Sequence, residues 1–187
     1  MLSHLRTRWR ASLPTDIALL RGINVGGKGI LPMKDLAALC SALGFANPRT
    51  YIQSGNVLFE SPLSRHKLRT ALEDALAARM ARKVDVLLRT PQELRSILAA
   101  NPFPGREPSK TAVVFLGNAV SGEIFSRVSP PGGEEIHPCG TEVFVFYPNG
   151  MGQTKLKLPL AGVPSTVRNI ATVAKLLALA EGSANSA

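Results

Sequence analysis

The chain has 187 residues, of which 45% are hydrophobic and 19% charged, a balance that is typical of folded globular proteins and excludes a disordered chain. Its 22 Lys and Arg residues outnumber its 13 Asp and Glu residues, so the formal net charge is +9 at pH 7. This excess favours acidic partners such as nucleic acid or nucleotides, although scattered basic residues are also typical of a solvated surface.

The first 15 residues are basic and contain no apolar core of signal-peptide length, so we expect a tail outside the folded part of the chain. No run of about 18 apolar residues follows, which predicts that no segment spans a membrane. The cysteines are Cys40 and Cys139, and two cysteines imply no disulfide framework. We therefore expect a cytoplasmic protein.

Residues 16–89 show an alternation of strand and helix patterns. The predicted elements are a strand at 16–21, a helix opened by Pro32 and closed by Gly44, a hairpin of 50–53 and 57–60, a helix from Ser64, and a strand at 84–89. The order β-α-β-β-α-β predicts the ferredoxin-like arrangement, an antiparallel four-stranded sheet backed by two helices.

Residues 90–187 are predicted to form a second, smaller α+β half with a C-terminal helix. Thr90 and Glu93 have capping-box spacing around Pro91, so a helix begins there, and the proline-rich segment 101–110 is the expected seam between the halves. The later elements are a strand at 111–116, a short helix at 121–128, a hairpin of 134–137 and 141–147, and a helix from about Val167 to Glu181.

The first candidate site is a glycine-rich, cationic turn that follows the apolar strand. Its candidate ligand-binding residues are Arg21, Asn24, Gly26, Gly27 and Lys28. Glycines allow backbone N–H groups to converge on an anion, so the turn is either an anion nest or a turn that needs glycine only for its geometry. A P-loop is excluded because Gly29 replaces the Mg²⁺-binding hydroxyl residue and Pro32 delays the helix.

The second candidate is the hairpin turn Gln53-Ser54-Gly55-Asn56. Ser54 lacks the strand–turn–helix context of a nucleophile elbow, so this segment is either a plain turn or a turn whose amides, with Ser54, contact a ligand. In the predicted topology, this turn and the glycine-rich turn need not lie at the same end of the sheet.

The third candidate is Arg168 with Asn169, expected at the start of the last helix, where an anion would be favoured. The alternatives are that Arg168 caps this helix or bridges the two halves. His137 and Cys139 lie near Glu134 and Glu135, but a second pair of ligands is missing, so we expect no metal and no cofactor. The two adjacent glutamates are expected at the surface.

Three stretches, at 19–28, 50–56 and 166–169, together resemble the hallmarks of the bacterial family called domain of unknown function 1697. The third departs from the family pattern, since Ile170 stands where an aromatic residue is usual. The resemblance implies a two-part α+β protein with a ferredoxin-like first half, and it brings no established activity. The signature positions are Arg21, Asn24, Gly26, Gly27, Lys28, Gln53, Ser54, Gly55, Asn56, Arg168 and Asn169.

The leading hypothesis from the sequence is a protein that binds a phosphate-bearing ligand, a nucleotide or nucleic acid, at the glycine-rich turn. The second is a small-molecule enzyme of unassigned class with a cleft between the halves. The third is self-association through the hairpin strand 141–147 as an exposed edge. The sequence does not predict the oligomeric state.

Overall fold

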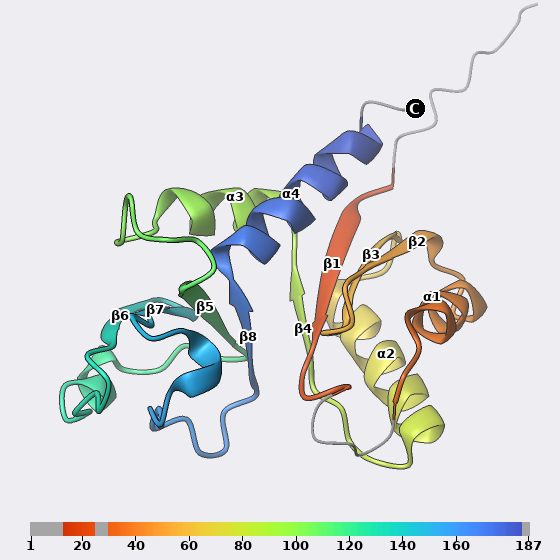
Figure 1. Ribbon diagram of the computed structural model, residues 1–187. Helices are drawn as coiled ribbons and strands as arrows, with labels where there is room; N and C mark the ends of the chain where they lie inside the picture. Colours follow the sequence, from red (N-terminus) through yellow and green to blue (C-terminus); the bar gives the residue numbers. More distant parts are fainter. Residues whose placement is uncertain (1–12, 25–29, 185–187) are drawn as a thin grey trace, which may run out of the picture.

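The computed structural model describes residues 13–24 and 30–184. The basic tail predicted at residues 1–15 therefore lies outside the described residues, except for residues 13–15. Gly26, Gly27 and Lys28 lie wholly outside them. The described part is a mixed α/β structure with two four-stranded antiparallel sheets and four α-helices (Figure 1). No helix in it is long and apolar enough to cross a membrane.

The first sheet has the strand order β2-β3-β1-β4, and every neighbouring pair is antiparallel. Along the chain the elements are β1 (Thr15–Leu20), α1 (Met33–Ala42), β2 (Ala46–Tyr51), β3 (Asn56–Glu60), α2 (Arg65–Met80) and β4 (Val86–Arg89). Each type and order agrees with the sequence prediction, but β2 begins four residues before the predicted strand at 50–53 and ends two residues before its end.

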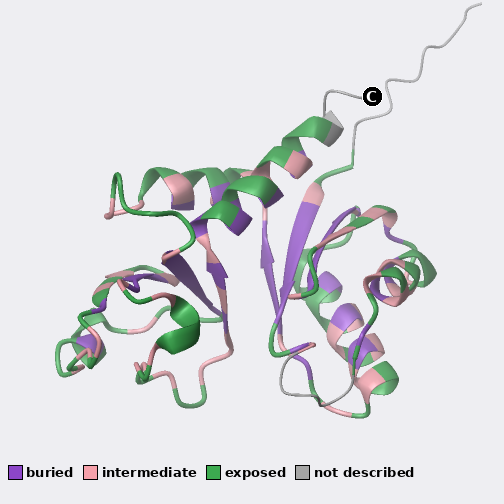
Figure 2. Cartoon of the chain, in the orientation of Figure 1, coloured by how far each residue is buried: buried purple, intermediate pink, exposed green. Residues whose placement is uncertain are grey.

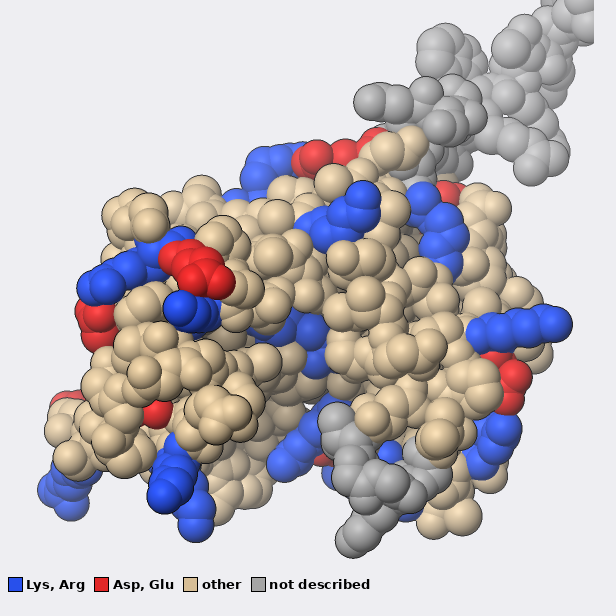
Figure 3. Space-filling view, viewed as in Figure 1, with Lys and Arg blue, Asp and Glu red and all other residues tan. Residues whose placement is uncertain are grey.

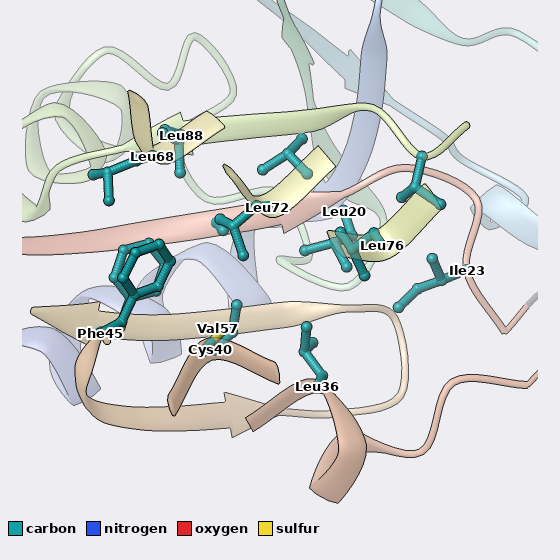
Figure 4. Packing of buried hydrophobic residues seen from close by; sticks show 14 of the residues in the cluster. Leu20, Ile23, Leu36, Cys40, Phe45, Val57, Leu68, Leu72, Leu76 and Leu88 are labelled. Atoms are coloured by element: carbon teal, nitrogen blue, oxygen red, sulfur yellow. The ribbon is translucent and has the colours of Figure 1, made fainter. Parts of the chain in front are cut away.

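Helices α1 and α2 pack on one face of this sheet. Leu68, Leu72 and Leu76 recur every four residues, so they form one stripe on α2 and are fully buried. They meet Leu36 and Cys40 of α1 over the side chains of β1 and β3 (Figure 4). This cluster is the core of the first half.

The opposite face of the first sheet is covered by the second half. Ile17 and Leu19 alternate along β1 with residues of the first core and pack in a shared cluster with Phe115 and Phe144. Helices α3 (Pro91–Ala99) and α4 (Ile170–Ala184) complete that cluster. A strand covered on both faces needs apolar side chains on both, which explains the uninterrupted buried run of β1 (Figure 2).

The second sheet has the order β6-β7-β5-β8. Its strands are β5 (Thr111–Leu116), β6 (Glu135–Cys139), β7 (Glu142–Phe146) and β8 (Ser165–Asn169), with 3₁₀ turns η1 (Gly122–Phe125) and η2 (Met151–Gln153). The prediction that residues 141–147 form an exposed edge is wrong, because β7 pairs with β5 on one side and β6 on the other.

The end of the chain differs from the sequence prediction in one element. Residues 165–169 form β8 against β5, and the last helix begins only at Ile170. Arg168 therefore lies in a strand and not at a helix N-terminus. The physical reason is that the β-branched Thr166 and Val167 suit a strand, and pairing with β5 satisfies backbone groups that an open edge would leave exposed.

Two smaller expectations also change. The short helix predicted at 121–128 is only the 3₁₀ turn η1. Glu134, expected at the surface, is buried and accepts a hydrogen bond from Gly132 N at 2.8 Å. By contrast, the capping box of α3 is confirmed, since Glu93 N donates to Thr90 Oγ1 and Thr90 N donates to Glu93 Oε2.

Candidate functional site

The loop after β1 and the β2–β3 turn lie at the same end of the first sheet. Leu20 N donates to Gly55 O at 2.9 Å, and Arg21 N donates to Asp85 O at 3.0 Å. The segments 20–24, 52–55 and 82–85 therefore meet, and we call this region the β1 end. The topology of the first sheet thus brings together the first two of the three motifs that the sequence singled out, and the third reaches the same region through Arg168.

Asn24 fastens the loop that leaves β1. Its amide group donates to Leu31 O at 3.0 Å and to Gln53 O at 2.9 Å, while Asn24 Oδ1 accepts from Leu31 N at 2.7 Å. Asn24 also has a positive φ of 56°, a conformation that asparagine tolerates better than most residues. Its side chain therefore joins Leu31 and the hairpin turn to the end of β1.

Gly55 is required where the hairpin turn approaches β1. Its φ is +78°, and a Cβ atom there would lie 2.4 Å from Ile23 Cδ1 and 3.0 Å from Leu20 Cβ. No side chain fits that space without moving the core of the first half. The glycine of the Ser-Gly-Asn motif is thus explained by packing alone.

Arg168 reaches from β8 into the β1 end and is only 6% exposed. Its Nε donates to Asn56 Oδ1 at 2.6 Å, and one terminal nitrogen donates to Ser54 O at 2.8 Å and to Leu20 O at 3.0 Å. The other terminal nitrogen donates to Thr166 Oγ1 at 2.8 Å. All three nitrogens are thus engaged within the protein, and they join the second half to the first.

Burial lowers the pKa of Arg168 to about 10, which still leaves the guanidinium charged at pH 7. Asn56 completes this network, because its amide nitrogen donates to Tyr51 O at 2.8 Å and to Ser54 Oγ at 3.0 Å. Asn169 has a separate role, since its Oδ1 accepts from Thr172 N at the start of α4. The bridging alternative for Arg168 accounts for these contacts.

The solvent-facing side of the β1 end carries a cationic pocket of about 290 Å³. It is lined by Arg21, Gly22, Arg82, Lys83 and Asp85. Arg21 and Lys83 place nitrogens 3.1 and 3.2 Å from the two carboxylate oxygens of Asp85, with side chains 52% and 80% exposed. Arg82 donates to Gly22 O at 2.8 Å. In Figure 3, Lys and Arg side chains are spread over the visible face, and some of them lie at the indentation between the halves.

Burial alone would raise the pKa of Asp85, but hydrogen bonds from Arg21 and Lys83 outweigh it and lower that pKa below its usual range. Sequence reasoning missed Arg82 and Lys83 as site residues. The signal available for them was the short basic cluster at 79–83, just before the β4 strand. That this cluster lies close to Arg21 follows only from the antiparallel pairing of β4 with β1.

The two predicted site residues not yet described, Gln53 and Ser54, differ in exposure. Gln53 is exposed in the hairpin turn and Ser54 is half-buried beside it. Among the described residues, no three His, Cys, Asp or Glu side chains gather as metal ligands would. A separate pocket of about 130 Å³ lies between the halves, lined by Arg65, Arg69 and Asn118 among others.

The comparisons with known proteins agree with this architecture. Among solved structures, the conserved bacterial protein SP0830 from Streptococcus pneumoniae matches 90% of this chain over 99% of its own, with a TM-score of 0.71 and 23% sequence identity. At that identity the likeness concerns the fold alone. No curated protein matches the chain. The model of a family described as "Protein of unknown function (DUF1697)" matches residues 13–144, more than half of the chain. The first two motifs lie within the matched residues and the third, at 166–169, lies outside them; the predicted family is confirmed, and the chain belongs to it.

Proposed function

We propose that the protein binds a phosphate-bearing ligand, a nucleotide or nucleic acid, at the β1 end. The observation that carries the proposal is the cationic pocket, which is lined by Arg21, Arg82 and Lys83 and by one carboxylate, that of Asp85. Three positive groups and one negative group leave a charge of +2 at pH 7. An uncompensated positive pocket attracts phosphate oxygens and raises the local concentration of anionic ligands.

Within this proposal the predicted site residues take two kinds of role. Arg21, Gln53 and Ser54 face the ligand together with Arg82 and Lys83, and Gly26, Gly27 and Lys28 of the glycine-rich turn add backbone N–H groups and one more charge. The other predicted residues do not contact the ligand in this proposal. Their side chains are hydrogen-bonded within the protein and hold the loops in place; they are Asn24, Asn56, Arg168 and Asn169.

The test is binding of labelled single- and double-stranded RNA and DNA, and of mononucleotides, by the full chain across a salt series. The variant Arg82→Ala/Lys83→Ala removes two charges from the pocket, and Lys67→Ala/Lys175→Ala removes two exposed charges from α2 and α4 as a matched control. For a nucleic acid, we expect the pocket variant to weaken binding about tenfold or more and to reduce the salt slope by about 1.5–2.

A chain that lacks residues 1–12 separates the pocket from the basic tail. Binding that is lost only with the tail, or that is unchanged in affinity and salt slope in the pocket variant, would overturn the proposal. Lys28→Ala tests the glycine-rich turn in the same assay, and a loss comparable to that of one pocket cation is expected.

A second candidate function is an enzyme that acts on a small molecule in a cleft between the halves. The pocket of about 130 Å³ favours it, because Arg65, Arg69 and Arg89 from the first half meet Gly117 and Asn118 from the second half there. Ligand screening by thermal shift with Arg69→Ala as the test variant separates this function from the first, since only a ligand of this cleft loses its stabilising effect in that variant.

We also infer that residues 16–89 form a ferredoxin-like unit and residues 90–187 a second α+β unit. The strand order β2-β3-β1-β4, with α1 and α2 on one face, supports the first assignment. A cytoplasmic location is part of the same proposal, and its support is that Cys40 and Cys139 are both free thiols.

A further inference from the structure

The second half contains a small pocket that neither the sequence motifs nor the proposed function uses. Its volume is about 240 Å³, roughly that of eight water molecules. Two turns and the 3₁₀ turn η2 border it, and it is open to solvent on one side. The residues that matter to the argument are Gly132, Glu134, Tyr147, Asn149, Thr154 and Lys155.

One of the residues that line this pocket is Glu134, which is only 7% exposed. Its two oxygens accept hydrogen bonds from Gly132 N, at 2.8 Å, and from the hydroxyl of Thr154. A Cβ atom on Gly132 would lie 3.0 Å from Glu134 Oε1, so a glycine there lets the turn close around the carboxylate. These contacts hold the carboxylate in one position.

No cation compensates this carboxylate among the residues that the structure describes, because Glu134 takes part in none of their ion pairs. Lys155 lines the same pocket, yet it is exposed and forms no ion pair there. Buried charges in proteins are normally paired, and each carboxylate oxygen can accept more than one hydrogen bond. The pocket therefore offers an unpaired negative charge with free acceptor positions.

We propose that this pocket binds the primary ammonium group of a small molecule, with Glu134 as its counter-ion. An ammonium group brings three donors, which suit the free lone pairs of Glu134 and of the Asn149 amide oxygen. Tyr147 also lines the pocket, and an aromatic ring attracts a cation where its face is accessible. The amide nitrogen of Asn149 donates a hydrogen bond to Gly132 O at 3.3 Å, which leaves the amide oxygen as the group that can accept from an ammonium.

The phenol of Tyr147 adds no negative charge to the pocket. Burial and the nearby charge of Glu134 raise the pKa of Tyr147 to about 12, so at pH 7 the phenol is neutral and adds no second negative charge. The site differs from the β1 end in the sign of its charge and in the elements that build it. If this pocket does not bind an ammonium group, the proposed function at the β1 end is unaffected.

The experiment is a titration of the full-length ¹⁵N-labelled chain with n-propylammonium chloride, followed by amide chemical shifts. The comparison probes are 1-propanol, which has the same shape without the charge, and sodium chloride at equal ionic strength. We expect saturable shifts of the Gly132, Glu134 and Thr154 amides with propylammonium alone. Shifts that do not saturate, or that propanol reproduces, would overturn the proposal without any variant.

Two variants assign the binding to the carboxylate. Glu134→Gln is expected to weaken propylammonium binding about tenfold or more, since it replaces a charge-assisted hydrogen bond with a neutral one. Glu123→Gln removes an equal charge from an exposed position in the same half and should leave the affinity within about twofold. Equal affinities of the wild type and a folded Glu134→Gln chain would refute the assignment.

Discussion

Replacing Arg168 by alanine should destabilise the whole chain, because this one side chain joins the two halves at the β1 end. After truncation, Leu20 O and Gly55 O keep other donors, whereas Asn56 Oδ1 and Ser54 O lose the donor that Arg168 supplies. An unsatisfied buried acceptor costs about 1–3 kcal/mol, so the two together cost about 2–6 kcal/mol. Water can reach the half-buried Ser54, which favours a value of about 3 kcal/mol.

Urea unfolding followed by far-ultraviolet circular dichroism measures this loss, and thermal unfolding should show a decrease in Tm of about 6–12 °C for a chain of this size. The control is Arg127→Ala, which removes an exposed arginine of the second half and should change stability by less than about 0.5 kcal/mol. A double-mutant cycle with Asn56→Ala isolates the contact at 2.6 Å, with an expected coupling above about 1 kcal/mol. A loss below about 1 kcal/mol for Arg168→Ala would refute the bridging role.

Three further predictions follow from particular contacts. Gly55→Ala should destabilise by about 1–3 kcal/mol more than Gly22→Ala in urea unfolding, because both have positive φ but a Cβ clashes only at Gly55; equal losses would contradict this. Burial raises the pKa of Asp16, so the folded state holds the proton more tightly than the unfolded state and the charged form costs stability. Asp16→Asn should therefore stabilise the chain at pH 7, with a gain that vanishes below about pH 4 as the carboxyl becomes protonated in both states; a gain independent of pH would refute this. Burial also raises the pKa of Cys40 to about 12, so a native chain should react with a thiol reagent at the exposed Cys139 alone and at both cysteines after unfolding.

Most elements could be predicted because their signals are local. The leucines of α2 recur at helical spacing, and Thr90 and Glu93 bracket Pro91 at the start of α3, so neither element depends on distant residues. Strand β8 could not be predicted in this way. Residues 165–169 become a strand because β5 offers them a partner, and that pairing spans about 50 residues of sequence between Leu116 and Ser165.

The prediction that β7 is an exposed edge was wrong for the same physical reason. The alternating residues of 142–146 predict a strand, but they do not reveal which neighbours it has, and its position between β6 and β5 is a property of the whole sheet. In the candidate site, the polar residue types indicated which positions matter, but they did not show whether each side chain points to solvent or into the protein. Asn56 and Arg168 are polar and lie in motifs, which suggests a ligand, yet their polar atoms bind the protein itself.

The inward direction of Arg168 changes how the positive charge of the chain can be used. A guanidinium whose three nitrogens are all engaged inside the protein has little to offer a phosphate, so under the proposed function the attraction would come from Arg21, Arg82 and Lys83 of the pocket, with Lys28. Arg168 still bears on binding, because it holds Leu20 next to the hairpin turn and so sets the distance between Arg21 and the turn's polar residues. Its loss should therefore weaken ligand binding through the position of the loops, while the salt slope, which counts the cations that meet phosphate, stays nearly the same. A change in slope as large as that of Lys83→Ala would instead place Arg168 in contact with the ligand.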